Sequence, residues 1–255
     1  MGTDKENITQ KQSGSNNTQI GVQNNYKGLS PVDATKMAFQ IFQEYYPQLR
    51  DSVLQELREL VNEKLRQVPA ENIIPPKARV VVPVLQNASI TEETEIRELY
   101  ANLLANSMNK VVKNGVHPGF VEIIKQLCPD EAKILKYISK SRQVPVITLR
   151  FEDAHSNGID IVKNFSDIGE MVGCENIFSI NAYFDNLIRL GLVAQPAGRH
   201  LINSDLYERL KQHGFIVMKT HIAPFYPKYN KVSYVESYIE MTPFGDKFCD
   251  ICITR

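Results

Sequence analysis

The side chains best suited to metal binding or nucleophilic chemistry in this chain are its cysteines and histidines. Only Cys249 and Cys252 are closely spaced, as C-x-x-C in the stretch FCDIC. A tetrahedral zinc site needs four ligands, usually from two such pairs. The remaining candidates are scattered: Cys128, Cys174, His117, His155, His200, His213 and His221. We therefore predict no metal site, with both thiols packed into the core on a C-terminal helix. A redox or metal role for the pair is the alternative.

The chain also lacks the motifs of common catalytic sites. It contains no G-x-S-x-G, no Walker A sequence and no H-E-x-x-H. His117 precedes Pro118 at an expected helix start, where it is predicted to cap or to pack. The acidic run from Glu92 to Glu98 opens another expected helix, where negative charge suits the helix dipole without any metal ion. We predict no enzymatic activity and no cofactor, and a toxin-like enzyme with an unrecognised site is the alternative.

Length and charge restrict the possible partners. The 255 residues are enough for one or two domains. Lysine plus arginine and aspartate plus glutamate both total 29, so no net charge draws the protein to nucleic acid or to an anionic membrane. No apolar run is long enough to span a bilayer, and the first thirty residues are too polar for a signal peptide. We expect a cytoplasmic protein without a membrane span.

Helical patterns begin at residue 30. The stretch SPVD at residues 30–33 is typical of a helix start, with a capping serine and a proline at the first helical position. Apolar residues then recur in steps of three and four over Met37–Leu65. Pro47 interrupts this pattern, because proline removes a backbone donor and disfavours helical geometry at the preceding residue. We predict two helices, or one bent helix, between residues 31 and 68.

The sequence after residue 68 first allows either a strand or a helix and then shows clear helical patterns. Prolines punctuate an apolar run in which Val80–Val82 would suit a strand, and a helix beginning at Pro76 is equally compatible. Thr91 is predicted to cap a helix that ends at Gly115. The stretches HPGFV and CPDEA each place proline at a first helical position. Two short helices are therefore expected, with a tight turn at Cys128–Pro129.

Composition changes near Gln143. The stretches VPVITLRF, FIVMKTHIA and SYVESYIEMT contain the β-branched and aromatic residues of strands. Helices are expected at about Ile161–Val172, in IFSINAYFDNLIRLGLV, in the inserted stretch INSDLYERLKQHG and from Pro243. This order is that of a winged-helix module, with the helix ending at Leu190 in the recognition position.

The predicted fold class is α+β and mainly α. Residues 1–29 are expected to be a disordered or β-pairing segment, residues 30–128 a helical domain, and residues 129–255 a winged-helix-like module with an inserted helix.

The charge of that module argues against a dedicated DNA-binding role. It has 15 basic and 15 acidic residues, whereas affinity for DNA depends largely on neutralising phosphates with lysine and arginine. Nucleic-acid binding is possible but not favoured over protein contacts. Its candidate contact residues are Asn181, Arg189, Lys219, Lys228 and Lys231.

Several motifs after residue 75 form a recognisable set: ELYANLLAN from Glu98, HPGFV from His117, QLCPDEA from Gln126, NLIRLGLV from Asn186 and MTPFGDKFCDIC from Met241. Over residues 75–255 the chain resembles the Abi-alpha (abortive infection alpha) family of bacterial and phage-borne proteins. Where the family pattern has serine before the Pro–Asp turn, this chain has Cys128, a weaker helix cap. The resemblance implies a role in antiviral defence and supplies no catalytic residues.

The N-terminal segment has a composition that favours strand pairing. From Gln12 to Tyr26 it has neither charge nor proline, and Lys11 and Lys27 flank it. It resembles the amyloid-signalling motifs of prokaryotic immunity proteins related to the RHIM type. The matching residues are Asn17, Gln19, Ile20, Gly21, Val22, Asn24 and Tyr26. A plain linker and a nucleic-acid-facing arm are the alternatives.

Together these features predict an interaction and assembly protein of prokaryotic antiviral defence. The N-terminal segment would recruit further copies or another protein. A nucleic-acid-binding regulator that uses the winged helix is the alternative.

Overall fold

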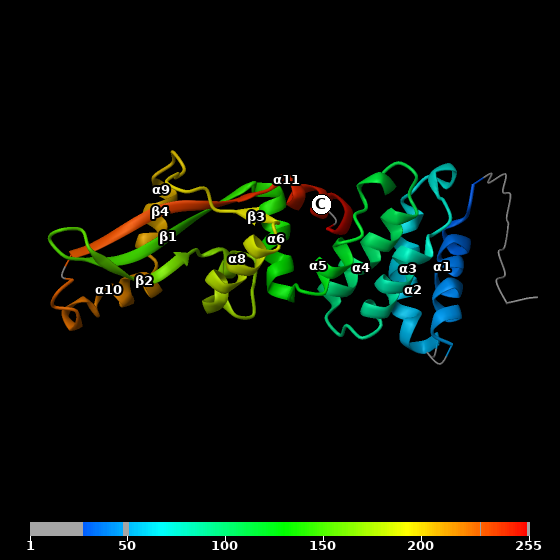
Figure 1. Ribbon diagram of the computed structural model, residues 1–255, viewed down its shortest axis with the longest axis horizontal. Coiled ribbons are helices and arrows are strands. Elements are labelled where there is room, and N and C mark those ends of the chain that lie inside the picture. Colours follow the sequence, from blue (N-terminus) through cyan, green and yellow to red (C-terminus); the bar gives the residue numbers. More distant parts are fainter. Residues whose placement is uncertain (1–27, 48–50, 230, 254–255) are drawn as a thin grey trace, which may run out of the picture.

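The computed structural model of the protein describes residues 28–47, 51–229 and 231–253. They form an elongated body that has helices at one end and long strands at the other (Figure 1). The predicted self-association residues between Asn17 and Tyr26 lie outside the described residues. Within the described ranges, no helix has the length and apolar character needed to cross a bilayer.

The two helices predicted around Pro47 are present. Helix α1 spans Pro31–Tyr45, and α2 spans Asp51–Arg66. Ser30 caps α1, because its Oγ accepts a hydrogen bond of 3.1 Å from the backbone N–H three residues later. Tyr46 leaves the helical conformation with a φ of −131°, as expected for a residue before proline. Pro47 therefore separates the two helices.

The valine run is helical, not extended. Helix α3 spans Ala78–Ala88 and includes Pro83. Val81, Val84 and Leu85 are fully buried, and their spacing of three and four residues places them on one helical face. Burial of this face decides between the two alternatives that the local sequence left open.

Helix α4 spans Thr94–Ser107 and is shorter than predicted at both ends. Thr91 does not cap it, because the Thr91 Oγ1 instead donates a hydrogen bond of 2.9 Å to a carbonyl oxygen at the end of α3. The helix also stops before Gly115, since the backbone that follows forms a β-bridge between Ile73 and Asn109. Pairing with a segment more than thirty residues earlier in the chain thus ends the helix sooner than predicted.

The two short helices are present, although the first begins at Phe120 and not at the predicted Pro118. Helix α5 spans Phe120–Ile124, and α6 spans Pro129–Ser141. At the turn between them, the backbone N–H of Cys128 donates to Oε2 of Glu131 at 2.9 Å. This contact is the acidic half of a capping box, which satisfies a backbone donor at the start of α6.

Four strands form one antiparallel sheet in the order β2-β1-β4-β3. Their bounds are β1 Gln143–Glu152, β2 Gly158–Phe165, β3 Val193–Ala194 and β4 Lys231–Met241. The two long strands, β1 and β4, pair along the whole length of β1. Strands β2 and β3 lie at the edges, so β2 forms one border of the strand-rich end (Figure 1).

The helix predicted over residues 161–172 is wrong for its first half. Residues 161–165 belong to strand β2, and only α7, Ile168–Met171, is helical. A tight turn before β2 explains the difference: Oδ1 of Asp153 accepts hydrogen bonds from the backbone N–H groups of His155 and Asn157. This Asx-type turn folds β2 back along β1.

The remaining helices follow the predicted order with one correction. They are α8 Ile180–Arg189, α9 Asp205–Lys211, α10 Gly214–Thr220 and α11 Pro243–Cys252. Helix α9 is the predicted inserted helix. The strand predicted in FIVMKTHIA is wrong, because this stretch forms α10 with His213 as its cap: His213 Nδ1 accepts a 3.3 Å hydrogen bond from the Phe215 N–H.

Short 3₁₀ helices cover Ala70–Asn72, Lys113–Gly115, Ile177–Ser179 and Ala223–Phe225. The described chain is therefore α+β and mainly helical.

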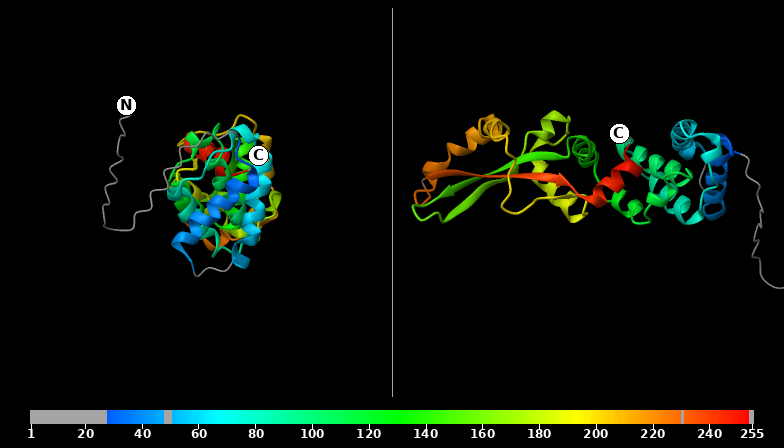
Figure 2. Two further views of the ribbon diagram at one scale, coloured as in Figure 1. Left: turned by 90° about the vertical axis from the view of Figure 1, so that its right-hand side faces the viewer. Right: turned by 90° about the horizontal axis from the view of Figure 1, so that it is seen from above.

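Two hydrophobic cores hold these elements together. The larger runs from Ala34 to Ile253 and crosses the predicted boundary at residue 128, with α11 packed against both α4 and α6. The smaller lies at the strand-rich end, where Tyr207, Leu210 and Ile216 of α9 and α10 pack on Ile147 of β1. Figure 2 shows α9 and α10 along one side of the long strands. The small core fixes these helices beside the sheet.

Candidate functional site

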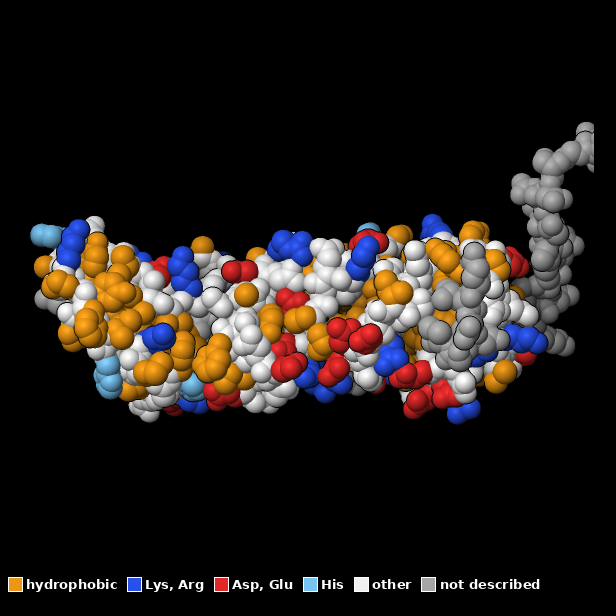
Figure 3. Space-filling model, turned by 90° about the horizontal axis from the view of Figure 1, so that it is seen from below, with side chains coloured by type: hydrophobic (Ala, Val, Ile, Leu, Met, Phe, Trp, Pro, Cys, Tyr) orange, Lys and Arg blue, Asp and Glu red, His pale blue; other side chains and the backbone are white. Residues whose placement is uncertain are grey.

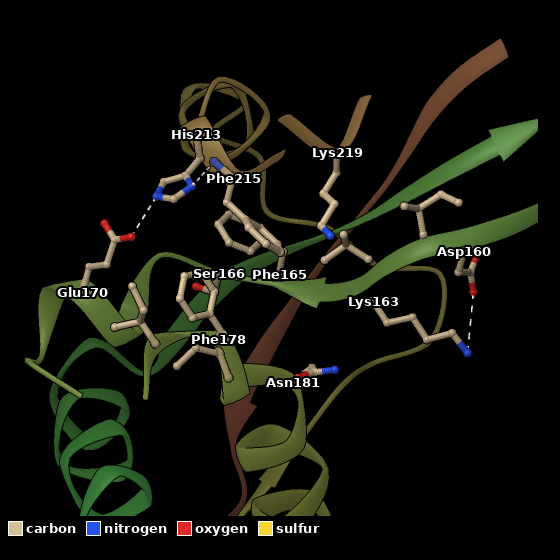
Figure 4. A pocket seen from close by; sticks show the side chains of 14 residues that line it. Asp160, Lys163, Phe165, Ser166, Glu170, Phe178, Asn181, His213, Phe215 and Lys219 are labelled. Carbon is tan, nitrogen blue, oxygen red and sulfur yellow. Dashed lines mark hydrogen bonds and ion pairs between the residues drawn. The ribbon is translucent and has the colours of Figure 1, made fainter. Parts of the chain in front are cut away.

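Two of the five predicted nucleic-acid contacts line one cavity of about 410 Å³ beside the edge strand β2. Asn181 is in the first turn of α8, and Lys219 is in the last turn of α10. We call this cavity the β2 groove; its lining includes Val162, Phe165, Phe178, Asn181, Phe215 and Lys219. Phe215 and Lys219 lie on one side of β2, and Phe178 and Asn181 lie on the other (Figure 4).

The other three predicted contacts, Arg189, Lys228 and Lys231, are not part of the groove lining. Arg189 is held against the body, where its Nη2 donates to Oε1 of Gln126 at 3.0 Å. The Lys231 Nζ lies 3.6 Å from a carboxylate oxygen of Glu152 at the far end of the strands. The structure therefore does not assemble the five residues into one basic strip.

Aromatic rings form the apolar wall of the groove. Phe165 and Phe215 are stacked, with centroids 5.7 Å apart and an interplanar angle of 25°. The ring centroid of Phe178 lies 5.6 Å from that of Phe215, and Phe178 is 71% exposed. The Lys219 Nζ is 5.4 Å from the centroid of the Phe215 ring, within cation–π range. An exposed ring beside a partly buried stack is a surface that an apolar or aromatic group can cover.

The carboxylates of the groove already have side-chain partners. Asp160 Oδ1 accepts a hydrogen bond of 2.7 Å from Arg150, and Glu170 Oε1 lies 3.0 Å from Nε2 of His213. His213 also holds the start of α10 through its Nδ1. These side chains are therefore engaged in fixing the groove walls, which leaves the rings, the Asn181 amide and the Lys219 ammonium group as its recognition groups.

Hydrophobic side chains gather at the same end of the molecule. Figure 3 shows them over the strand-rich end of the face seen from below, whereas acidic side chains gather toward the helical end. The exposed large hydrophobic residues in this half of the chain include Phe178, Met218, Phe225 and Val235. Large exposed apolar patches are rare on monomeric soluble proteins, and where they occur they mark interaction sites.

A buried carboxylate that sequence reasoning did not single out lies at the centre of the body. Asp130 is only 5% exposed. Its oxygens accept hydrogen bonds from the backbone N–H groups of Glu175 and Asn176 at 2.9 and 3.0 Å. They also accept a 3.0 Å bond from the hydroxyl of Tyr183. Asp130 thus ties the start of α6 to the segment before α8 and to α8 itself.

These contacts decide the ionisation of Asp130. Burial raises the pKa of its carboxyl group, but the two backbone hydrogen bonds, the Tyr183 hydroxyl and the charge of Lys133 act the other way, and the net pKa is lowered. The same burial and the hydrogen bond to Asp130 raise the pKa of Tyr183. An ionised, fully hydrogen-bonded carboxylate suits a structural joint better than a proton-transfer site.

Glu131 completes this joint. Besides the Cys128 N–H, it accepts a hydrogen bond of 2.8 Å from the side-chain amide of Asn186 in α8. The same amide contacts the carbonyl oxygen of Gln126 at 3.0 Å. The proline–aspartate turn therefore positions α8, and through α8 it positions one wall of the β2 groove. The sequence feature that could have indicated this joint is the run Pro-Asp-Glu at the start of a helix.

The predicted positions of the cysteine pair and of His117 are confirmed. Cys249 and Cys252 lie on α11 and are fully buried, and burial raises the pKa of Cys252. His117 Nδ1 accepts a hydrogen bond of 3.0 Å from the Gly119 N–H, and its ring packs near Phe120. Among the described residues, no three His, Cys, Asp or Glu side chains are grouped as metal ligands.

Comparison with protein families gives a match to the abortive infection alpha model over residues 49–252. The chain belongs to the abortive infection alpha family. A solved structure of an uncharacterized protein from the hydrocarbon-degrading marine bacterium Alcanivorax borkumensis SK2 is 20% identical to it, with a TM-score of 0.39. That alignment covers 53% of this chain and 92% of the other. Comparison with curated proteins gives no match.

The sequence landmarks of this abortive infection alpha protein meet in its large core. Asn102, in ELYANLLAN, donates a hydrogen bond of 2.9 Å to the carbonyl oxygen of Cys252, at the end of MTPFGDKFCDIC. The Asn186 amide of NLIRLGLV contacts Glu131 of QLCPDEA. The landmarks therefore hold the helices together, while the β2 groove lies outside them, at the strand-rich end.

Proposed function

We propose that this abortive infection alpha protein acts in antiviral defence by interaction and assembly, without catalysis. Family membership supports the defence role. The N-terminal segment from Asn17 to Tyr26 recruits further copies of the chain or another protein. The elongated body supplies the surface on which the recruited molecule docks.

The observation that carries this proposal is the β2 groove. Its wall is made of phenylalanine rings, one of them 71% exposed, while its carboxylates are already paired with Arg150 and His213. Such a site offers apolar contact area and few reactive groups. Binding surfaces are enriched in aromatic side chains of this kind.

The environments of the best acid candidates support a role without catalysis. Asp130 and Glu131 are buried, and they accept hydrogen bonds from three and two donors respectively. A general acid or base needs an accessible lone pair or proton near a substrate. Both carboxylates instead accept bonds that hold α6 and α8 together.

A second candidate function, nucleic-acid binding, rests on Asn181 and Lys219 converging beside an exposed Phe178. The strand order β1-β4-β3, together with α6 and α8, supports the winged-helix interpretation, with β2 as an added strand. Lysine, an amide and an exposed ring form a minimal platform for a base and its phosphate. Asp160 and Glu170 in the same groove make this function less favourable than protein binding.

Phage challenge and light scattering test the first function together. The double variant Ile20→Asp/Val22→Asp places charge in the N-terminal motif, and Ser13→Asp/Ser15→Asp adds the same charge outside it. We expect concentration-dependent assembly and protection from phage for the wild type and the serine control, and loss of both for the motif variant. Equal assembly and protection in all three proteins would contradict the proposal.

Fluorescence anisotropy with labelled single- and double-stranded DNA tests the second function. If it is correct, binding weakens steeply with salt, and Lys219→Glu lowers affinity while Lys140→Glu, at an exposed position on α6, does not. Salt-independent or undetectable binding would exclude it.

A further inference from the structure

We propose that the β2 groove is the docking site for residues Gln19–Tyr26 of a second copy of this chain, which joins the sheet as a strand beside β2. This inference rests on the proposed function, because it names the surface that receives the N-terminal segment. Four observations support it: an open sheet edge, the side chains of the groove walls, the charge of both partners and the position of the groove in the molecule.

Strand β2 offers backbone hydrogen-bonding groups to an incoming strand. It pairs with β1 on one side, and on its other side no strand of the described residues lies next to it. An edge strand of this kind is a template for strand addition, in which main-chain hydrogen bonds supply affinity. β2 is eight residues long, and the stretch QIGVQNNY from Gln19 to Tyr26 has the same length.

The two walls of the groove meet where the ring centroids of Phe178 and Phe215 lie 5.6 Å apart, and beyond that contact they present different side chains to that stretch. In an extended strand, Ile20 and Val22 point to one face, and Gln19 and Gln23 point to the other. On the α10 side, the ring of Phe215 stacks on Phe165 of β2 itself, and this apolar surface suits the aliphatic face. The opposite wall carries the Asn181 amide, which is able to bond glutamine amides, next to the exposed ring of Phe178.

Charge favours an uncharged occupant. The segment from Gln12 to Tyr26 contains no Asp, Glu, Lys, Arg or His, and its one ionisable side chain, Tyr26, is neutral at pH 7. The groove carboxylates Asp160 and Glu170 already have partners in Arg150 and His213, and the lining balances these two carboxylates with Lys163 and Lys219. The phosphates of a nucleic acid would instead lie near both carboxylates. A neutral peptide strand is therefore the better fit.

The position of the groove selects a second copy over the chain's own segment. Helix α1, to which the segment leads, lies at the helical end, whereas β2 and α10, which line the groove, lie in the strand-rich half of the long axis (Figure 1). A segment that leaves one end and docks at the other end of the next molecule makes a head-to-tail contact. Contacts of this type propagate as open chains unless their rotation closes a ring.

Mixing two full-length variants tests this arrangement. The segment variant is Ile20→Asp/Val22→Asp, and the groove variant is Phe178→Asp, at a side chain that is 71% exposed. The matched control is Phe225→Asp, at an 81% exposed ring outside the groove lining. Circular dichroism first establishes that all three are folded. In sedimentation velocity, we expect each of the first two to be monomeric alone and to form a one-to-one heterodimer when mixed, while the control assembles like the wild type.

A labelled peptide of residues 15–27 gives a second readout. It is expected to bind the segment variant, and adding Phe178→Asp weakens this binding about tenfold, which corresponds to about 1.4 kcal/mol. Adding Phe225→Asp leaves the affinity unchanged.

The results that overturn the inference are distinct from those that overturn the proposed function. If Phe178→Asp assembles like the wild type while the segment variant does not, the segment pairs with itself and only the docking site is wrong. If the wild type stays monomeric at every concentration and the peptide does not bind, both are wrong. Binding of an oligothymidine probe in the groove, without peptide binding, assigns the groove to nucleic acid and also overturns the inference.

Discussion

The side-chain amide of Asn102 donates a hydrogen bond of 2.9 Å to the backbone carbonyl oxygen of Cys252, 150 residues later in the chain. One helical turn on, Asn106 makes the same contact with the carbonyl oxygen of Ile251 at 2.7 Å. The last carbonyl groups of a helix have no partner within it. Helix α4 therefore caps the end of α11 and joins the helical end of the molecule to the C-terminal part of the described chain.

Replacing Asn102 by leucine is predicted to destabilise the protein. The change keeps the side-chain size but removes the donor, so a buried carbonyl oxygen loses its partner. We expect the free energy of unfolding to fall by about 1–3 kcal/mol, measured by urea denaturation. Asn114→Leu, at an exposed position, is the control and should have little effect. Equal losses for the two variants would show that the contact with Cys252 is unimportant.

The carboxylate of Asp130 is predicted to make stability depend on pH in the acid range. Its pKa is lower in the folded protein than in the unfolded chain. The stabilisation that the Asp130 carboxylate gives to the fold is therefore complete above the ordinary carboxyl pKa of about 4. It disappears as the pH falls through the lower pKa of the folded state.

The variant Asp130→Asn tests this dependence. At neutral pH its free energy of unfolding should be about 1.5–3 kcal/mol lower than that of the wild type. The difference should shrink as the pH drops below about 4. Asp185→Asn, at an exposed position on α8, should match the wild type throughout. A difference for Asp130→Asn that stays constant with pH would contradict the assignment.

Gly245→Ala is predicted to be strongly destabilising because of close packing. A Cβ at this position would collide with the backbone carbonyl group of Leu192 and with the Met241 sulfur. Backbone cannot move aside as a flexible side chain does, so we expect a loss of about 1–3 kcal/mol or more. Gly214→Ala, where a Cβ meets open space, is the matched control. Thermal unfolding compares the two; similar melting temperatures would refute the prediction.

The four thiols are predicted to react at different rates with an alkylating reagent. Cys249 and Cys252 are fully buried, and burial raises the pKa of Cys174 to about 11. Cys128 is partly exposed, although burial raises its pKa as well. Because the thiolate is the reactive form, at pH 8 we expect slow labelling of Cys128 and much slower labelling of the others.

Mass spectrometry of the labelled protein checks this order. The variant Cys128→Ser should lose the first labelling event, and unfolding in denaturant should expose all remaining thiols. Early labelling of Cys249 in the folded protein would contradict the packing of α11.

Much of the helical framework could be predicted because local chemistry decides it. Pro47 separates α1 from α2, and proline at residue 129 opens α6, since a proline ring acts on its nearest neighbours whatever the tertiary structure. The placement of Cys249 and Cys252 on α11 likewise followed from their three-residue spacing in a helix that was expected from Pro243.

The errors arise where distant contacts override local preference. The stretch that forms α10 is rich in β-branched residues, yet Ile216 packs into the small core as part of a helix. Strand β2 depends on the turn at Asp153, which folds it back along β1. Sequence alone could not show that Asn181 and Lys219 would share a groove, because their meeting depends on both of these elements.

The contact between α4 and α11 also has a consequence for biogenesis. Asn102 leaves the ribosome 150 residues ahead of its acceptor at Cys252. At translation rates of about 5–20 residues per second, the two are separated by roughly 8–30 s. During that interval the face of α4 that later receives α11 is without its covering helix. The nascent chain therefore presents an apolar helical surface to chaperones well before the fold can close.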